Sequence, residues 1–491
     1  MPLIIKEVVK ISAIEIIHEQ NPWWDDPNII DNDEYVKRYT KSKFPWFPEF
    51  LEKLRFEPSI YSVRGPRRIG KTTLIKYIIK QLIDKGIEPR DIIYASCDSL
   101  TSWTELRDIL RIYAGKPRKK YIFIDEASFI LEWSRAIKYT FDVGFLRDDF
   151  VLITGSHAMD ILRGVERLPG RRGQGVDFVL LPATFGEFVR TIDNKFYLRI
   201  ISSDDPVYEM YSNLSTLRSL FEKYLLAGGF PKAQHEVMEA GRVSHNFMME
   251  FITYLKGDAL KEKLDVNALL LSARRILETL TIPVSWRTLS NRTGYHHEKI
   301  KEHIEFLRMA FAVDYIYPPR QTKNGPIPDT NKNRKIYPLD PFITYTFHSW
   351  IYGTENHTKI VERWLRTPEK RGQLIESIIL RHLIQWTSNN IFSEEIRRNI
   401  FYISTGKREI DFFAVRNNIA LAIESKERKR TAYHIALANY IAPDKRTIKI
   451  MTTIDEIKKE KNYIKIPTPI LLILLSINKI DKIEKTQILD T

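Results

Sequence analysis

Residues 59–83 read SIYSVRGPRRIGKTTLIKYIIKQLI, and this stretch decides the fold of the first part of the chain. A short apolar run leads into Gly65, four further residues and then Gly70-Lys71-Thr72, and an amphipathic pattern typical of a helix follows. The two glycines let the backbone curl so that successive N–H groups at a helix start face a phosphate. Strand, glycine-rich loop and helix in this order predict a P-loop that binds a nucleotide.

The residues that follow the glycines have distinct expected roles. Lys71 should reach the β- and γ-phosphates of ATP, and we expect it to face solvent until nucleotide binds. The Thr72 hydroxyl should ligate Mg²⁺. The predicted nucleotide-binding residues are Gly65, Pro66, Arg67, Arg68, Ile69, Gly70, Lys71, Thr72, Thr73 and Asp125.

A second apolar run, KYIFIDEA (120–127), ends in the pair Asp125-Glu126. Asp125, at the carboxyl end of a buried strand, can hold the magnesium ion through water, and Glu126 can polarise the attacking water. This is the Walker B arrangement, and behind a P-loop it predicts ATP hydrolysis, or a degenerate relative of proteins that hydrolyse ATP.

Two more runs complete the expected sheet. FVLITGS (150–156) places Thr154 and Ser156 where a polar sensor of the γ-phosphate would stand, whereas DIIYAS (91–96) carries no obvious chemistry. Strands that alternate with helices predict a parallel sheet covered on both faces. The ligand should then lie at the carboxyl edge of its strands.

Phosphoryl transfer also needs a cation on the transferring group, and the segment ILRGVERLPGRRG (161–173) offers several arginines. Any of them could act as an arginine finger on a neighbouring subunit, which predicts a homo-oligomer, with a hexameric ring as one form. The alternative is a solvated basic loop. The candidates are Arg163, Arg167, Arg171 and Arg172, of which we assign Arg171 as catalytic.

Near the N-terminus, Trp23 and Trp24 in NPWWDDP (21–27) could stack on adenine or on a base. Tryptophans at such a place more often anchor the segment to the core, and we favour anchoring.

Length and composition bound the remaining possibilities. The chain has 491 residues, too many for one core, and about three domains are expected. The single cysteine, Cys97, rules out an internal disulfide framework and predicts a cytoplasmic protein. The N-terminus lacks the pattern of a secretory signal. The most apolar run, IPTPILLILLSI (466–477), is shorter than the ~20 residues of a membrane span, so we expect a buried strand and no membrane partner.

The formal net charge of +14 favours polyanion partners, nucleic acid above all. The alternative is the lysine-rich, isoleucine-rich surface of a thermophile, on which charges of both signs form ion-pair networks.

The middle of the chain has a mainly helical pattern, with turns at the Pro and Gly-Gly-Phe-Pro punctuation of YLLAGGFPKA (224–233). Residues 279–318 then predict a winged helix-turn-helix: a helix that contains Leu289, a turn at Gly294, a second helix over about 296–309, and a strand. The second helix should either enter a DNA groove or dock a protein. The side chains expected to face solvent on it are His296, Lys299, Lys301 and His303. The Pro- and Asn-rich segment 318–335 should be the wing loop and a domain boundary.

Charged residues interrupt an expected buried hairpin in GKREIDFFAVRNNIALAIESK (406–426). A two-residue Asn417-Asn418 turn pairs residues whose numbers sum to 835, so Asp411 should lie opposite Glu424, with Lys426 on the same face. Facing carboxylates repel unless a divalent cation bridges them or one is protonated. The hairpin therefore predicts a Mg²⁺ or Mn²⁺ site.

Two neighbouring segments extend this interpretation. Glu376, on an amphipathic helix, is a candidate third carboxylate, and Lys426 could position water for phosphodiester attack. The basic run KERKR (426–430) suits a phosphate backbone. The alternative is a structural cluster in which Asp411 and Glu424 pair with Lys426 and nearby arginines.

Glu376, Asp411 and Glu424-Ser425-Lys426 resemble the E…D…ExK signature of the restriction-endonuclease-like, or PD-(D/E)xK, nuclease superfamily. The whole chain resembles archaeal AAA+-type DEXX-box ATPases, in which a P-loop domain precedes a winged helix and such a C-terminal domain. The resemblance spans most of residues 20–465. The matching stretches, in the family's order, are GPRRIGKTT, YIFIDEA, LITGS, the Gly170-Arg171 pair, GGFPKA and KNRKIYPLDPF.

The resemblance implies the fold, ATPase activity through Lys71, Thr72, Asp125 and Glu126, and a role on branched or forked DNA. It leaves nuclease activity open, because many such C-terminal domains serve as DNA-binding or structural modules. We therefore expect an ATP-hydrolysing DNA-binding machine for recombination or repair intermediates such as Holliday junctions or forks. The alternatives are a metal-dependent DNA endonuclease gated by ATP and a signalling switch without motor activity.

The expected architecture is multidomain α/β. An N-terminal segment and an AAA+-type (ASCE) parallel-sheet ATPase core should occupy residues 1–190, and a helical lid 191–265. A winged helix should occupy 266–342, and an α/β restriction-endonuclease-like domain 343–491.

Overall fold

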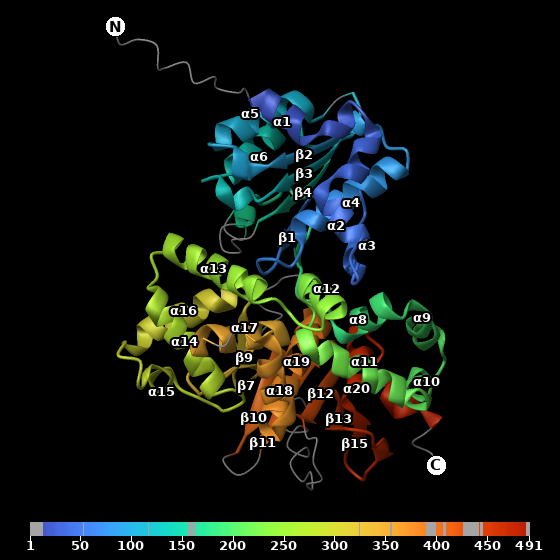
Figure 1. Ribbon diagram of the computed structural model, residues 1–491, viewed down its shortest axis with the longest axis vertical. Helices are drawn as coiled ribbons and strands as arrows, with labels where there is room; N and C mark the ends of the chain where they lie inside the picture. Colours follow the sequence, from blue (N-terminus) through green and yellow to red (C-terminus); the bar gives the residue numbers. More distant parts are fainter. Residues whose placement is uncertain are drawn as a thin grey trace. The chain divides into compact units, whose positions relative to one another are not determined.

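The computed structural model forms two compact units (Figure 1). Met1–Pro66 and Gly70–Leu180 make up the first, and Arg67–Ile69 and Leu181–Thr491 make up the second. The structure describes residues 13–52, 54–115, 117–155, 161, 164–323, 325–353, 356–388, 399–405, 409–425, 441 and 445–487.

A five-stranded parallel sheet is the centre of the first unit, with strand order β2-β3-β4-β1-β5. Its inner strands are almost wholly buried, because helices cover both faces. The predicted parallel sheet is thereby confirmed. The strands are β1 (Ser59–Arg64), β2 (Ile92–Ser96), β3 (Tyr121–Asp125), β4 (Phe150–Thr154) and β5 (Asp177–Val179).

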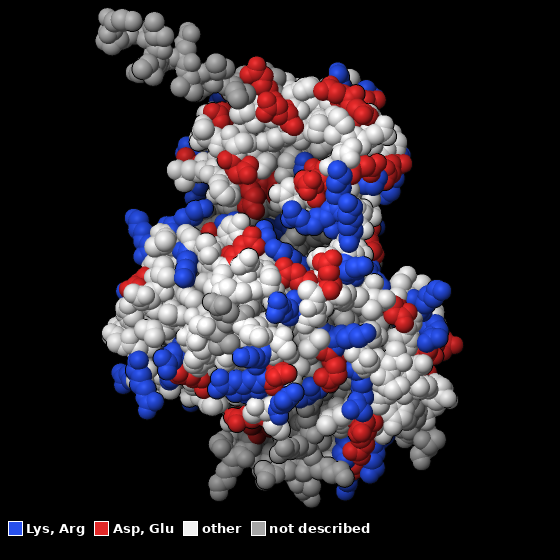
Figure 2. Space-filling model, viewed as in Figure 1, with Lys and Arg blue, Asp and Glu red and all other residues white. Residues whose placement is uncertain are grey.

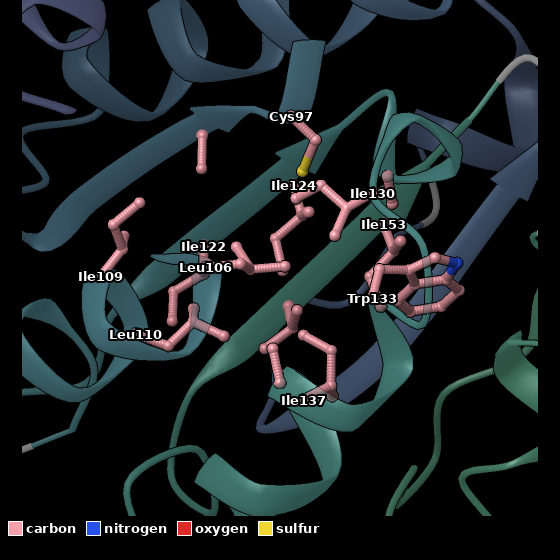
Figure 3. Close-up of a cluster of buried hydrophobic side chains, with 14 of the residues drawn as sticks. Cys97, Leu106, Ile109, Leu110, Ile122, Ile124, Ile130, Trp133, Ile137 and Ile153 are labelled. Carbon is pink, nitrogen blue, oxygen red and sulfur yellow. The ribbon is translucent and has the colours of Figure 1, made fainter. Parts of the chain in front are cut away.

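The core of this unit lies between the sheet and the helices α5 and α6 (Figure 3). Side chains such as Ile122, Ile124 and Ile153 from the strands meet Leu106 and Ile137 from the two helices. The helices are α1 (Ala13–Gln20), α2 (Glu34–Thr40), α3 (Glu49–Glu52), α4 (Lys71–Asp84), α5 (Trp103–Tyr113) and α6 (Ser134–Asp142).

The two N-terminal tryptophans anchor their segment, as favoured from the sequence. The Nε1 atoms of Trp23 and Trp24 donate to the Ile92 carbonyl oxygen at 3.3 and 2.9 Å. Trp23 is wholly buried. This end of the chain is therefore fastened to the start of β2.

The second unit begins with a helical array. Its turn between α11 and α12 falls at Gly228-Gly229, as the punctuation predicted, with Gly228 at φ 67°. A side chain at Gly228 would collide with the Asp340 carboxylate, which accepts the Gly229 N–H at 2.7 Å. The helices are α8 (Phe185–Ile192), α9 (Asn194–Ser202), α10 (Pro206–Ser212), α11 (Leu214–Ala227), α12 (Pro231–Ala240) and α13 (His245–Lys261).

Three helices and two short antiparallel sheets follow, in the order expected for a winged helix-turn-helix. The chain turns at Gly294, which has φ 76°, before the second of the two helices that the sequence predicted. β6 pairs with β9, and β7 pairs with β8 in a hairpin. The elements are α14 (Val266–Glu278), α15 (Trp286–Ser290), α16 (His297–Met309), β6 (Val313–Ile316), β7 (Pro319–Thr322), β8 (Gly325–Pro328) and β9 (Lys335–Pro338).

The C-terminal part carries a six-stranded mixed sheet of order β10-β11-β12-β13-β15-β14. The β11–β12 hairpin pairs Phe412 with Ile423 and Arg416 with Ile419, so the register that sums to 835 is correct. Asn417 turns the chain at φ 52°. The strands are β10 (Ile400–Ser404), β11 (Glu409–Arg416), β12 (Ile419–Ser425), β13 (Arg446–Thr453), β14 (Lys458–Lys459) and β15 (Ile464–Pro467), and the helices are α17 (Pro341–Tyr352), α18 (His357–Arg366), α19 (Pro368–Ser388) and α20 (Thr468–Ser476).

The apolar run 466–477 is not the strand that we expected, because most of it forms the helix α20. Pro469 stands in the first turn, where its missing N–H costs nothing, and the residues after it are apolar on every side. A helix that is apolar all round is buried on all sides, and its sequence cannot be told from a buried strand. In the part of the chain that is described, no helix has the length and apolar character needed to cross a membrane.

Candidate functional site

The predicted P-loop joins the end of β1 to the start of α4. Gly70 precedes the helix with φ 101°, a conformation that favours glycine. Gly65 is needed for a different reason, because a Cβ atom there would lie 2.2 Å from the Leu180 carbonyl oxygen. The first glycine therefore allows close packing, and the second allows the turn into the helix.

Lys71 is the first residue of α4, and its side chain is turned into the loop. It is only 6% exposed, and its Nζ donates to the carbonyl oxygens of Gly65 and Pro66 at 3.0 and 3.1 Å. Our expectation that it faces solvent is wrong, because a buried ammonium needs hydrogen-bond acceptors and the curled loop supplies them. The ammonium already lies in the loop that the sequence assigns to phosphates.

Asp125 joins three hydroxyl groups at the carboxyl edge of the sheet. Tyr94 donates to its Oδ2 at 3.0 Å, and Thr154 and Thr72 also hydrogen-bond to the carboxylate. Asp125 is 1% exposed, and this burial raises its pKa, while the bond from Thr154 acts in the opposite direction. The predicted residues Thr72, Asp125 and Thr154 therefore meet at one point, although they come from three segments.

Glu126 follows directly and is half-buried, with φ 52° and ψ 38°. This left-handed conformation costs a residue other than glycine of order 1–3 kcal/mol, and such strain is typical of functional positions. It directs the chain into the short helix Ala127–Phe129. Ser156, the other proposed sensor, lies outside the described residues.

Residues that the sequence argument passed over surround Asp125. Tyr94 comes from β2, the strand that we judged to have no chemistry, and the Lys76 Nζ lies 3.8 Å from its ring centroid. Lys76 also lies 3.5 Å from an Asp33 carboxylate oxygen. Burial lowers the pKa of Lys76, and Asp33 opposes that shift. In the sequence, the only sign that Tyr94 could reach Asp125 is its hydroxyl group on β2, the strand that lies beside β3.

The described finger candidates differ in their partners. Arg171 is paired with Asp142, with Nε–Oδ1 2.7 Å and Nη2–Oδ2 3.1 Å. Arg172 forms a similar double contact with Asp177 at 2.9 and 2.8 Å. The Arg167 side chain is exposed, and Arg163 lies outside the described residues. The Arg171 assignment stays a prediction.

Two predicted nucleotide-binding arginines belong to the short segment Arg67–Ile69, which groups with the second unit. Within that unit Arg67 donates to both carboxylate oxygens of Asp258 at 2.7 and 2.9 Å. Arg68 pairs with Glu250 at 2.6 Å. Both arginines therefore have carboxylate partners on α13.

The acidic residues of the hairpin lie around a lysine that the sequence argument did not include. The observed β11–β12 pairing ends at Phe412–Ile423, and Asp411 and Glu424 are the next residues of the two strands. The Lys335 Nζ, from β9, lies 3.4 Å from the Asp411 Oδ1 and also pairs with Glu409. Lys426, the lysine that we assigned to this site, lies outside the described residues.

Glu376 joins the same cluster from α19, where its Oε2 accepts the Tyr337 hydroxyl at 3.1 Å. Burial and the nearby Asp411 raise the pKa of Glu376 well above its usual value. Burial by itself would lower the pKa of Lys335, but Asp411, Glu376 and Glu409 together raise it. Within the described ranges, no group of three or more His, Cys, Asp or Glu residues could hold a metal ion.

The predicted recognition helix α16 presents few uncompensated cations. Lys299 pairs with Asp265 at 3.2 Å, and Lys301 lies 3.6 Å from Glu298. His303 does not face solvent as expected: it is wholly buried, and its two ring nitrogens contact the carbonyl oxygens of Lys299 and Asp265. The helical period places it on the inner face with Ile300 and Leu307.

Two family models match the chain. Residues 57–189 match the model described as an AAA domain, and residues 218–351 match a domain of unknown function, DUF8612. Among curated proteins, the uncharacterized protein MJ1544 of Methanocaldococcus jannaschii is 22% identical over 416 residues, which are 80% of this chain and 82% of that protein. An uncharacterized protein of Haemophilus influenzae is 29% identical over 175 residues, 34% of this chain and 38% of that protein.

Solved structures resemble the chain only weakly. The Walker-type ATPase PABY2304 of Pyrococcus abyssi has a TM-score of 0.37 at 12% identity, over 66% of this chain and 97% of its own. The ORC2 protein of Aeropyrum pernix, in its ADPNP–ADP complexes, has a TM-score of 0.34 at 13% identity, over 65% and 92%. The family match and the geometry around Lys71 and Asp125 identify residues 57–189 as an AAA-type P-loop ATPase domain.

Proposed function

We propose that this chain hydrolyses ATP and uses the energy to act on branched or forked DNA during recombination or repair. The observation that carries the proposal is the convergence of Thr72, Thr154 and Tyr94 on the buried Asp125, one residue before Glu126. A carboxylate held at the carboxyl edge of a parallel sheet, behind a P-loop, is the arrangement that ATP hydrolysis requires.

The roles of the residues follow from their positions. Bound Mg²⁺ would neutralise charge on the phosphates, and Thr72 and Asp125 are the oxygen donors placed to hold it. Lys71, at the start of α4, binds the β- and γ-phosphates together with the loop N–H groups. Glu126 orients and polarises the attacking water, and Thr154 contacts the γ-phosphate. An arginine from a second copy, with Arg171 as our candidate, completes the site.

The net charge of +14 supports DNA as the partner, but it does not locate the interface. On the face shown in Figure 2, Lys and Arg are interspersed with Asp and Glu. The β7–β8 hairpin suits the phosphate backbone better than α16 does, because Arg320 and Lys323 are exposed on it while the lysines of α16 lie beside carboxylates. We infer that this hairpin, the wing of the predicted winged helix, contacts DNA.

Replacement of both hairpin cations tests this assignment. The Arg320→Ala/Lys323→Ala variant should bind a labelled four-way junction roughly tenfold more weakly, because two phosphate contacts are lost. A plot of log affinity against log salt concentration should become less steep, with the magnitude of its slope smaller by about two. Fluorescence anisotropy over a series of salt concentrations gives both quantities.

The matched control is Lys299→Ala/Lys301→Ala on α16, which removes two positive charges from the competing surface. We expect it to change affinity by less than about twofold, because both lysines already lie near carboxylates. A larger loss in the control than in the hairpin variant would place the interface on α16. If the affinity for the junction does not vary with salt concentration, the proposal that DNA is the partner is wrong.

A second candidate function is ATP-gated DNA cleavage, which the carboxylates Asp411 and Glu424, next to the last β11–β12 pair, favour. It requires metal-dependent cleavage that Asp411→Ala abolishes. A third, a signalling switch, would show slow ATP turnover that is indifferent to DNA.

A further inference from the structure

Lys335 is a buried cation in the middle of the acidic cluster. It opens β9, where it pairs with Ile316 of β6, and its side chain is 1% exposed. The chain places this lysine among side chains from β11 and α19, far from β9 in sequence. Burial of a charged lysine is rare unless the charge is paired, so the acidic residues around it are its counter-ions.

Three carboxylates around Lys335, those of Asp411, Glu409 and Glu376, already have hydrogen-bond or ion-pair donors. The Asp411 Oδ1 faces the Lys335 Nζ at 3.4 Å, and its Oδ2 accepts the Ser425 N–H at 2.8 Å. Glu409 forms an ion pair with the same Nζ. The Glu376 Oε2 accepts the Tyr337 hydroxyl. These carboxylate oxygens therefore interact with one ammonium, that of Lys335, and with two further donors, the Ser425 N–H and the Tyr337 hydroxyl.

A divalent cation does not fit this arrangement. Mg²⁺ and Mn²⁺ take several oxygen ligands at short distance, and the carboxylates must turn toward a common point. Here the Lys335 ammonium contacts Asp411 and Glu409, and a second cation beside it in a buried setting would meet strong repulsion. The absence of a metal-binding group of three in the described ranges agrees with this.

We propose that Lys335 is the resident cation of this cluster, in place of a divalent metal ion, and that it fastens β9 to β11. The C-terminal sheet then serves to hold the domain together, and it does not cut. The inference concerns the second unit alone, so its tests do not depend on whether the protein hydrolyses ATP.

Neighbouring contacts run between the same elements. The Tyr402 hydroxyl of β10 donates to the Asn333 carbonyl oxygen at 2.9 Å, and the Tyr402 N–H donates to the Tyr317 carbonyl oxygen at 3.2 Å. Tyr317 follows β6 and Asn333 precedes β9, so both bonds join the same end of the β6–β9 pair to β10, the edge strand of the six-stranded sheet. Lys335 lies at this same end and adds the charged contacts to Glu409 and Asp411 of β11.

The first test is a Mn²⁺ titration of the full-length, nucleotide-free protein, followed by electron paramagnetic resonance. We expect no saturable Mn²⁺ site that depends on Asp411, so wild type, Asp411→Asn and Glu424→Gln should give the same binding curve. Binding that both variants retain lies elsewhere and supports the proposal. One Mn²⁺ per chain that both variants lose would overturn it.

The second test removes the lysine. Lys335→Met keeps the length of the side chain but leaves the carboxylates without their cation, so Mn²⁺ should bind at least about tenfold more tightly than to wild type. The matched control is Lys465→Met, which removes a partly exposed lysine that pairs with Glu456 and Glu460 in the same sheet. A folded Lys335→Met protein with wild-type Mn²⁺ affinity would contradict the proposal. If this variant does not fold, the wild-type titration decides.

Discussion

Lys71→Ala is expected to lower ATP turnover roughly 100- to 1,000-fold, the loss typical when one donor is removed from a charge-stabilising site. The Lys71 ammonium lies within the P-loop, where it donates hydrogen bonds to the carbonyl oxygens of Gly65 and Pro66. Lys71 is also the first residue of α4. Phosphate release at saturating ATP and Mg²⁺ measures the effect.

The same substitution should leave the protein folded. It removes two hydrogen bonds to loop carbonyl oxygens, and we expect Tm to change by no more than about 4 °C. The control is Lys80→Ala on the same helix, where the lysine pairs with Asp31 and Asp84 near the surface. Unchanged turnover in Lys71→Ala would overturn the nucleotide assignment, and a large fall in Tm would show that Lys71 is needed for folding.

Glu126→Gln should separate nucleotide binding from hydrolysis. The amide keeps the size of the side chain but cannot polarise water as a carboxylate does, so turnover should fall roughly 100- to 10,000-fold. Asp125, Thr72 and Lys71 are unchanged, so ATP affinity should stay within about threefold of wild type. Binding of a fluorescent ATP analogue and turnover, measured on the same preparation, give the two quantities.

Glu132→Gln is the matched control for this variant. Glu132 lies in the same segment between β3 and α6, also has a positive φ of 59°, and pairs with Arg135 at 2.9 Å. Its replacement should leave turnover near wild type. Turnover in Glu126→Gln equal to that of the control would remove Glu126 from the mechanism. Loss of ATP binding would make its role structural.

The sequence predicts those parts of the molecule that local pattern determines. The strand–loop–helix around Gly70 and the apolar run into Asp125 both fold as expected, because a single segment carries each signal. The β11–β12 register follows from the turn at Asn417, since a two-residue turn fixes every pair behind it.

The parts that depend on distant partners could not be predicted in this way. Tyr94 reaches Asp125 only because β2 and β3 are neighbours in the sheet. Lys335 reaches Asp411 across 76 residues, and nothing in the local sequence KNRKIYP marks it as a counter-ion. The run that became α20 is apolar on every side, so its period could not distinguish helix from strand.

The central claim is that ATP chemistry in residues 57–189 is coupled to DNA bound by the second unit. The most direct measurement is ATP turnover with and without a saturating four-way junction, for wild type and for Arg320→Ala/Lys323→Ala. We predict at least about fivefold stimulation of wild type, the lower end of typical coupling between sites, and the same stimulation of the variant only at a roughly tenfold higher junction concentration. Wild-type turnover that is equal with and without DNA would contradict the account.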